Sequence, residues 1–579
     1  MERRLLLTSV VGPYGVEDGD FGLLADGLKV HLTYGQGVHS PQGAQGCYGL
    51  HMLALNTAVP STVLEYPSWK GFLKELGRGY THVGITFIHA NVYRAKRMAE
   101  YVRANYPNAK IILGGYGTLI PEIADLVPND EVCRGEGVRW LRAYFGEDPE
   151  APIVYPLMPY YDGLRVYGIN VAKRLKSALI MCGLGCKGGC AFCGPTHQFG
   201  YRNYIPLLRT GRQFMALCRR AEEVLGAESY YILDDNFLKN SPMAIEVLPL
   251  MEQEGKASRF TLYGSADVVA EIGADFLVRF GVEQVWIGVE SSTVKYSKVK
   301  GVDVAALVSE LQSKGITVVT SVILFLPHHD RESVQQDIDW AIGLNSEITQ
   351  FAIYTPMPGT CAYDQCAAQG LLGPSPEYSR MHGMAMTLAR HPHFTAAEAE
   401  KIQLDAYRKK YETAGPSTLG KCQTMVRGYL QAVKDSQRRE EEGIAWDPET
   451  RRYVKTIATG PDLFMRLRLA EMRTRALRGR PVLLTCRVFA PNAATRRKAI
   501  EIAGMYERTF GRITIKDRVV SWGVLAFAVL EAAKIWLNKR FLGHDIIRYQ
   551  PATMRVEYRC GVGKGFGKPP ARGCQIADE

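Results

Sequence analysis

The stretch Met181-Cys182-Gly183-Leu184-Gly185-Cys186-Lys187-Gly188-Gly189-Cys190-Ala191-Phe192-Cys193 holds four of the chain's 13 cysteines. Cys186, Cys190 and Cys193 have the spacing C-x3-C-x2-C, and an aromatic residue precedes the last cysteine. Three thiolates on one glycine-rich loop can hold three corners of a cubane iron–sulfur cluster and leave the fourth iron open. Zinc usually takes four protein ligands; Cys182 could be the fourth, but no distant cysteine pair matches. The spacing therefore favours an iron–sulfur cluster.

Short apolar segments that are typical of buried strands alternate with helical patterns around this loop. Several of them end in turns of acidic, amide or small residues, the place where parallel α/β sheets bind ligands. A single turn of this kind could be structural, because Asp at a strand end often caps the next helix. The segments are Leu175–Met181, Tyr230–Leu233 with Asp234-Asp235-Asn236-Phe237, Tyr263-Gly264-Ser265-Ala266-Asp267, Val285–Ser291 with Gly288-x-Glu290, Val318–Leu326, and Phe351–Tyr354 with Thr355-Pro356-Met357-Pro358-Gly359-Thr360.

The cysteine loop is the C-x3-C-x-aromatic-C signature of the radical S-adenosylmethionine (radical SAM) superfamily, and the ordered turns resemble those of its barrel. The resemblance implies a partial (βα)6 barrel over residues 176–372. It also implies a [4Fe-4S] cluster on the three catalytic cysteines and S-adenosylmethionine on its open iron. The residues implied to bind this second cofactor are Phe192, Asp234, Asp235, Asn236, Ser265, Gly288 and Glu290.

Residues 1–150 also alternate strands and helices, which predicts a Rossmann-like domain with a parallel sheet. The strand-end segments of this domain resemble the cobalamin-binding domains of B12-dependent radical SAM enzymes. The Asp-x-His-x-x-Gly loop that supplies an axial histidine in classical cobalamin enzymes is absent, so the lower cobalt ligand is not predicted. A domain that keeps the fold without the cofactor is the alternative. The resemblance places cobalamin at Gly84, Thr86, Gly114, Gly115 and Tyr116.

Residues 151–175 are predicted to form a linker, and residues 373–579 a mostly helical α+β domain. Val482–Val488 is typical of a strand and Val524–Leu537 of a long apolar helix. From residue 451 to the end there are 26 Lys or Arg and 10 Asp or Glu, a net charge of +16 in a chain whose total is +11. A basic region of this kind favours an anionic partner, or it is simply a solvated surface. The apolar helix beside it suits a lipid-like substrate or peripheral contact with a membrane.

Composition excludes some classes of protein. A chain of 579 residues that is 46% hydrophobic and 22% charged is neither disordered nor fibrous. Thirteen cysteines are too few for a secreted disulfide scaffold, so we expect a cytoplasmic protein, with a peripheral location at the membrane as the alternative. No signal peptide is recognised, and Glu531 and Lys534 interrupt the one long apolar segment, which disfavours a spanning helix.

The resemblance implies a cobalamin-dependent radical SAM methyltransferase of class B, with weak similarity to hopanoid C-3 methylases near Thr196-His197. In such enzymes a 5′-deoxyadenosyl radical activates an unreactive carbon, and methylcobalamin supplies the methyl group. The implied partners are a small-molecule or lipid-like substrate and an external electron donor of flavodoxin or ferredoxin type. The alternatives are ring formation or oxidation without methyl transfer, tRNA modification, and a non-enzymatic zinc- or cobalamin-binding module. The basic tail lacks an RNA-binding signature, which disfavours a nucleic-acid partner.

Overall fold

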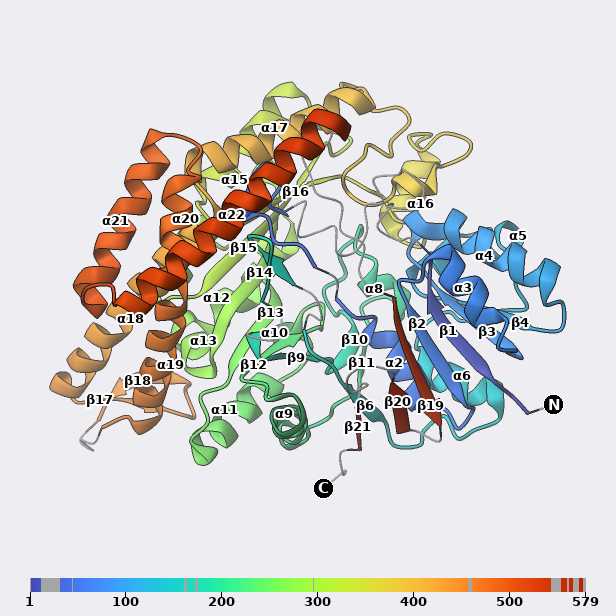
Figure 1. Ribbon diagram of the computed structural model, residues 1–579, viewed down its shortest axis with the longest axis horizontal. Coiled ribbons are helices and arrows are strands. Elements are labelled where there is room, and N and C mark those ends of the chain that lie inside the picture. Colours follow the sequence, from blue (N-terminus) through green and yellow to red (C-terminus); the bar gives the residue numbers. More distant parts are fainter. Residues whose placement is uncertain are drawn as a thin grey trace.

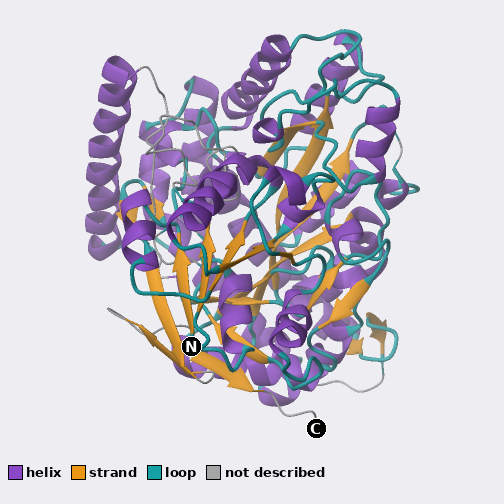
Figure 2. Cartoon of the chain, turned by 90° about the vertical axis from the view of Figure 1, so that its right-hand side faces the viewer, coloured by secondary structure: helices purple, strands orange, loops and turns teal. Residues whose placement is uncertain are grey.

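Two parallel sheets lie side by side, and helices surround both of them (Figures 1 and 2). The structure is a computed structural model that describes residues 2–11, 32–43, 45–160, 164–171, 175–294, 296–456, 461–542, 553–559, 562–565 and 572–575. The predicted α/β architecture, with a Rossmann-like domain, a partial six-stranded barrel and a helical carboxy-terminal region, is confirmed.

The amino-terminal sheet has the strand order β20-β19-β2-β1-β3-β4-β5. Its strands β1 to β5 are parallel, so the order 2-1-3-4-5 is that of a flavodoxin-like sheet, whose ligand site lies where the order reverses, at β1 and β3. The strands are β1 (Leu5–Ser9), β2 (Ser61–Glu65), β3 (His82–Thr86), β4 (Lys110–Gly114) and β5 (Glu131–Val132), and the main helices are α2 (Tyr48–Leu55), α3 (Trp69–Leu76), α4 (Val92–Asn105) and α6 (Gly137–Phe145).

The end of the chain returns to this first sheet, a feature that the sequence did not reveal. Strand β19 (Met554–Arg559) pairs antiparallel with β2, and β20 (Val562–Gly565) pairs with β19 (Figure 1, dark red beside blue). The His51 imidazole of α2 and the Tyr558 hydroxyl share a hydrogen bond of 2.5 Å, and both side chains are buried. Arg555 forms two hydrogen bonds with Glu75 of α3. Strand β19 is therefore part of the amino-terminal core.

The barrel sheet contains six parallel strands in the order β16-β15-β14-β13-β12-β9. Successive side chains of a strand point to opposite faces of the sheet. Phe260, Val285 and Ile287 pack against the outer helices, and the other face of the sheet is partly accessible. The strands are β9 (Ser177–Ile180), β12 (Ser229–Ile232), β13 (Arg259–Ser265), β14 (Val282–Glu290), β15 (Thr317–Leu324) and β16 (Ile348–Ile353), and the helices include α9 (Gly211–Leu225), α10 (Phe237–Asn240), α11 (Met243–Glu254), α12 (Ala266–Ile272), α13 (Ala274–Phe280), α14 (Val304–Ser313), α15 (Arg331–Gly343) and α16 (Cys361–Ala368).

The carboxy-terminal helices close the amino-terminal ends of the barrel strands. The buried Arg468 donates hydrogen bonds to the carbonyl of Ser258, which immediately precedes β13, and to that of Phe280, two residues before β14. Lys421 reaches Gln284 at the start of β14 with a 3.0 Å hydrogen bond. The opposite, carboxyl ends of the strands consequently face the amino-terminal domain. These helices are α17 (Ala396–Ala414), α18 (Ser417–Glu442), α19 (Leu463–Gly479), α20 (Leu483–Val488), α21 (Ala493–Phe510) and α22 (Ile515–Leu542).

One predicted strand in this region is wrong. Val482–Val488 lies in the short helix η6 (Arg480–Val482) and in α20. Leu483 and Cys486, three residues apart, are buried together against Ala499 and Ile502 of α21, so the apolar run packs with helical periodicity. Val524–Leu537 is helical as predicted, within α22.

Candidate functional site

The three cysteines of the signature lie on the loop that follows the hairpin strand β10 (Gly183–Gly185). The amide of Gly188 donates to the Cys186 thiol at 3.3 Å, and a Cβ at Gly188 would lie 3.3 Å from Cys186 Sγ and 3.9 Å from Cys190 Sγ. The Thr196 hydroxyl donates to the Cys186 carbonyl at 2.9 Å. The loop therefore brings at least two of the thiols around one glycine.

Charged and titratable groups lie close to the thiols and affect their pKa. Burial raises the pKa of Cys193 to about 12; the ammonium of Lys298 opposes the shift, and Cys190 and Asp235 add to it. Among the described residues no three His, Cys, Asp or Glu side chains form a site for a single metal ion. A four-iron cluster needs more widely separated thiolates than a single ion does.

Asp234 and Asp235 have different tasks, although they are adjacent in the sequence. Asp234 is fully buried and accepts hydrogen bonds from the Cys182 amide at 2.7 Å and from the hydroxyl of Tyr204 in β11 (Tyr204–Pro206) at 2.8 Å. Burial raises its pKa to about 6. Asp234 thus fastens the cysteine loop to the barrel, and its two carboxylate oxygens are already occupied by these hydrogen bonds.

Asp235 lies on the thiol side of the same turn. Asp235 is exposed to the space beside the thiols, but the surrounding protein desolvates its carboxyl group, and this desolvation, with the charge of Asp234, raises its pKa to about 7. It influences the titration of Cys186, of Cys193 and of Tyr116. A carboxyl group in this place can receive the amino group of a ligand.

Asn236 and Ser265 form the next part of the site. The Asn236 amide donates to the Ser265 hydroxyl at 2.9 Å, between the ends of β12 and β13. The side-chain amide oxygen (Oδ1) of Asn236 is buried and has no hydrogen-bond partner among the described residues. Since an unpaired buried acceptor is costly, this atom fits a ligand that donates to it.

The turn at the end of β14 joins Gly288, Glu290 and Lys298. The pairing of β14 with β15 is irregular between Gly288 and Glu290, and Glu290 has a φ of +63°, which is uncommon for a residue with a side chain. Glu290 forms an ion pair with Lys298, and a Cβ at Gly288 would lie 2.6 Å from the Lys298 ammonium. Lys298 also lies 5.6 Å from the ring centroid of Phe192, which contacts Tyr296 edge to face. Phe192 thereby connects the cysteine loop to this turn.

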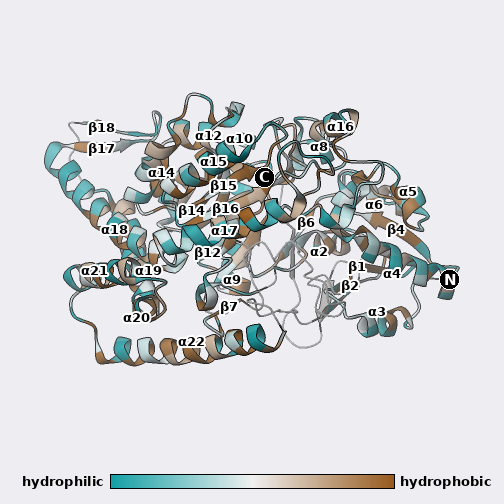
Figure 3. Ribbon diagram, turned by 90° about the horizontal axis from the view of Figure 1, so that it is seen from above, coloured by the Kyte–Doolittle hydropathy of each residue, from teal (hydrophilic) through white to brown (hydrophobic). Residues whose placement is uncertain are grey.

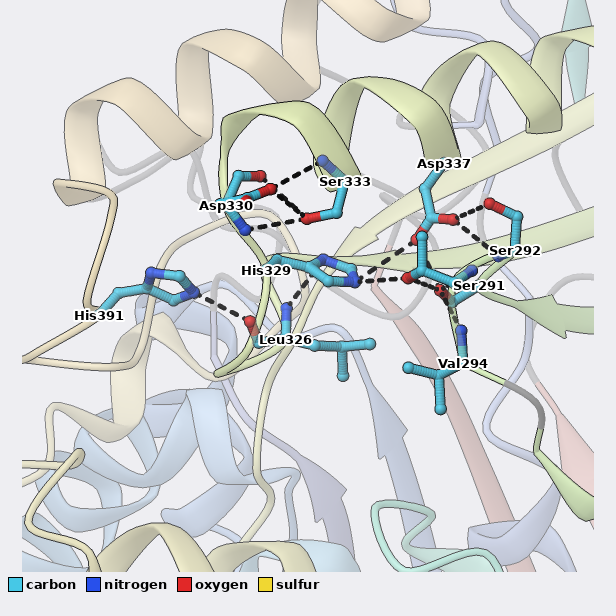
Figure 4. A network of polar contacts seen from close by, with 10 residues as sticks. Ser291, Ser292, Val294, Leu326, His329, Asp330, Ser333, Asp337 and His391 are labelled. Atoms are coloured by element: carbon cyan, nitrogen blue, oxygen red, sulfur yellow. Dashed lines mark hydrogen bonds and ion pairs between the residues drawn. The ribbon is translucent and has the colours of Figure 1, made fainter.

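A buried polar network holds the residues that follow Glu290 (Figure 4). Asp337 of α15 accepts hydrogen bonds from the Ser291 hydroxyl at 2.7 Å and from the Ser292 amide at 2.6 Å. The fully buried His329 lies 3.5 Å from the same carboxylate, and burial lowers the pKa of its imidazole to about 4. The Leu326 amide donates to His329. The network holds in place the residues that directly follow the unusual turn at Glu290.

In the amino-terminal domain, Thr86, Gly114 and Gly115 lie at the carboxyl ends of β3 and β4. Gly115 has a φ of +88°, and a Cβ there would lie 2.6 Å from the Phe87 carbonyl and 2.8 Å from the Thr86 hydroxyl. Only glycine fits this close approach. Gly84 lies instead in the middle of β3, where a Cβ would lie 2.9 Å from Leu7. The structure therefore gathers three of these four residues at one edge and places Gly84 inside the sheet.

Tyr116 connects the two predicted cofactor sites. A Cβ on Gly194, the residue after Cys193, would lie 3.4 Å from the Tyr116 ring. Burial raises the pKa of the Tyr116 hydroxyl well above its usual value, and Asp235 and Cys193 raise it further. The loop after β4 thus reaches the cysteine loop directly. Sequence reasoning missed Tyr204 and Lys298, since neither lies in a recognised motif.

The accessible face of the barrel sheet carries a row of aromatic and amide side chains. The hydroxyls of Tyr231 and Tyr263 are 2.6 Å apart, and the rings of Tyr263 and Trp286 are 5.4 Å apart. The Trp286 indole donates to Ser321 at 2.5 Å, and Ser321 donates to Gln350 at 2.8 Å. This row crosses from β12 to β16 below the turns already described.

Comparisons with known proteins agree with this fold. In sequence, the chain is 24% identical over 364 residues to an uncharacterized methyltransferase of Pyrococcus horikoshii, which covers 57% of this chain and 78% of the relative. No family model matches the chain. In structure, it is similar to TsrM of Kitasatospora setae, a radical S-adenosylmethionine methyltransferase solved with cobalamin and a [4Fe-4S] cluster. The TM-score is 0.50 and the sequence identity is 15%, and the match covers 83% of this chain and 99% of TsrM. A second TsrM structure, with tryptophan and a SAM analogue, gives a TM-score of 0.46 at 16% identity, over 65% of this chain and 78% of the other.

Proposed function

We propose that this chain, which has the fold of TsrM, is a cobalamin-dependent radical SAM methyltransferase that methylates an unactivated carbon of a small molecule. The observation that carries the proposal is the contact of Tyr116 with the residue after Cys193. Tyr116 directly follows Gly114 and Gly115, so the edge of the amino-terminal sheet and the cysteine loop lie next to each other. Two cofactors that act on one substrate carbon require such an arrangement.

The residues present fit the implied cofactors. Three partly accessible thiols on one loop, at Cys186, Cys190 and Cys193, suit a [4Fe-4S] cluster with an open iron. The orphaned carbonyl of Asn236 and the carboxyl of Asp235 suit the amino group of S-adenosylmethionine. For cobalamin, the open space beside Gly114 at the end of β4, where a Cβ would meet nothing within 4 Å, suits a large ligand at the edge of the sheet.

When bound, the cluster supplies the electron that cleaves S-adenosylmethionine to a carbon radical, and cobalamin supplies the methyl group. The chain itself positions and shields these groups. Asp234 keeps the cysteine loop on the barrel, and the Glu290–Lys298 pair keeps a cation beside the loop. Phe192, which packs against Tyr296, and Tyr116, which lies beside Gly194, place aromatic rings next to the loop.

The accessible barrel face supports a substrate with a planar or otherwise apolar part. The partly exposed Tyr263 and Trp286 offer aromatic surfaces, and Ser321 and Gln350 offer polar groups at one side. Binding sites for small molecules commonly combine an apolar wall with a few oriented polar groups. An external electron donor of flavodoxin or ferredoxin type belongs to the proposal, because the cluster must be reduced for each turnover.

Anaerobic reconstitution with iron, sulfide and hydroxocobalamin tests the proposal. We expect about four irons and about one cobalamin per chain, and production of 5′-deoxyadenosine with a strong reductant. Cys190→Ala should lose the cluster and the product, whereas Cys133→Ala, a change at a partly buried cysteine outside the loop, should keep both. Iron binding without cobalamin would refute the methyltransferase proposal and leave a single-cofactor radical enzyme.

A cobalamin-dependent enzyme that forms a ring or oxidises a C–H bond is the second candidate, and the same two cofactor sites favour it equally. S-adenosylmethionine with a deuterated methyl group distinguishes the two once a substrate is found. Deuterium in the product indicates methyl transfer, and its absence indicates the second candidate.

A further inference from the structure

Helix α22 lies along the outside of the carboxy-terminal region (Figures 1 and 3), and many of its large apolar side chains are exposed. At 28 residues it is about 42 Å long. Residues Ile515–Phe541 pass the length and hydropathy criteria for crossing a membrane, but such a helix alone is weak evidence of a span. Only 22% of its apolar window is buried in the protein. The exposed large apolar side chains are Ile515, Val519, Val520, Trp522, Phe527, Val529, Leu530, Trp536, Leu537 and Phe541.

The inward side of α22 is fixed to the protein along its length. Ser521, Leu525 and Ala528 are buried, and the helix packs on α20, on η6 and on the short helix η1 (Gly37–His39). Glu531 is also buried, and its carboxylate lies beside Gly168. A helix held in this way lies flat against the protein, so it can lie in a membrane surface but does not span the bilayer.

The exposed charges of α22 are all positive and lie on either side of its central segment Val519–Leu530. Asp517 is partly buried and Glu531 is buried, both on the inward side. Between Val519 and Leu530 no charged residue occurs. A continuous apolar strip thus has cations at both ends. The exposed cations are Lys516, Arg518, Lys534, Lys539 and Arg540.

We propose that α22 is an interfacial helix that docks this protein on a membrane surface rich in anionic lipids. The apolar strip enters the boundary between headgroups and acyl chains, and the terminal cations contact the headgroup phosphates. Stable attachment requires both contributions, because neither apolar insertion nor a basic patch alone holds a protein firmly on a bilayer. The proposal does not depend on which cofactors the barrel binds.

A second copy of the chain fits the same strip less well. In a twofold dimer, α22 would face its own copy, either parallel or antiparallel. Both arrangements bring the cations of Lys516 and Arg518 near cations of the partner helix, since the exposed charges at both ends are positive. Such like-charge contacts oppose association. An anionic lipid surface complements the same charges.

Flotation of the full-length protein with vesicles tests this inference. We expect flotation with vesicles of equal parts phosphatidylglycerol and phosphatidylcholine, little with phosphatidylcholine alone, and release at high salt. Leu530→Glu places a charge in the middle of the strip and should weaken vesicle binding at least about tenfold. The matched control is Leu463→Glu on α19, which is 68% exposed compared with 61% for Leu530, and it should bind as the wild type does.

The double change Lys516→Glu with Arg518→Glu supplies a second, independent variant, and it should remove the preference for anionic vesicles. Quenching of Trp522 and Trp536 fluorescence by lipids with brominated chains reports insertion directly. The proposal is overturned if the wild type does not float, or if Leu530→Glu floats equally well. It is also overturned if light scattering shows a dimer that Leu530→Glu converts to monomers, because a second copy then covers the strip.

Discussion

Replacing Lys298 by Met isolates the contribution of the ion pair beside the cysteine loop. Glu290 is only 4% exposed, and Lys298 is its partner in the ion pair. Removing one partner of a buried pair leaves an uncompensated charge, which typically costs about 3–5 kcal/mol. For a barrel of this size such a loss lowers the melting temperature by about 6–20 °C. Met keeps most of the apolar stem of lysine, so packing against Phe192 changes little.

Differential scanning fluorimetry of the apoprotein measures this effect without the cofactors. Glu290→Gln in the Lys298→Met background removes the unpaired charge and should restore most of the lost stability. Lys239→Met is the matched control, since its pair with Asp267 at 2.7 Å is about 30% exposed and should contribute about 0–1 kcal/mol. If Lys298→Met melts at the wild-type temperature, or if the double variant is no more stable than the single one, the reasoning about the pair is wrong.

Two further predictions concern other parts of the molecule. Gly428→Ala should destabilise the protein by about 1–3 kcal/mol in urea titrations, because the new Cβ would lie 2.1 Å from the Gly315 backbone. The control Gly523→Ala on α22, where a Cβ would meet nothing within 4 Å, should be neutral or stabilising. Equal stability of both variants would contradict this prediction. Burial alone would raise the pKa of Glu75, but hydrogen bonds from Arg555 and from a tyrosine lower it below its usual 4.5. The stabilisation by the Glu75–Arg555 pair is therefore complete above pH 4.5 and is lost as the pH falls through the lowered pKa. Hydrogen exchange of β19 should be slower in the wild type than in Arg555→Met at neutral pH, and this difference should shrink in acid. A difference that grows in acid would refute the reasoning.

The barrel was predictable because its strands are short apolar runs whose ends carry recognisable turns. Asp234-Asp235-Asn236 and the Gly288-x-Glu290 turn lie where the sequence places them, at the carboxyl ends of β12 and β14. Their division of labour was not predictable. Which of two adjacent carboxylates fastens the loop depends on Tyr204, and hydrogen bonds across 30 residues leave no periodic signal in the sequence.

Local patterns also failed where long-range packing decides the outcome. Val482–Val488 is rich in β-branched and apolar residues, yet contact with α21 makes it helical. The pairing of β19 with β2 joins residues nearly 500 positions apart, and no local pattern marks a strand as the edge of a distant sheet. Lys298 lies after a turn without regular structure, so only the fold brings it to Glu290.

The return of β19 to the first sheet links the order of synthesis to assembly. A ribosome makes β1 to β5 first, and domains generally fold as they emerge. Here the outer edge at β2 stays unpaired until the residues of β19, including Tyr558 and Arg555, have left the exit tunnel. A nascent chain stalled before residue 553 would expose that edge, and a premature stop codon near the end would damage the beginning of the protein. Quality control of the whole chain is thus coupled to completion of its first domain.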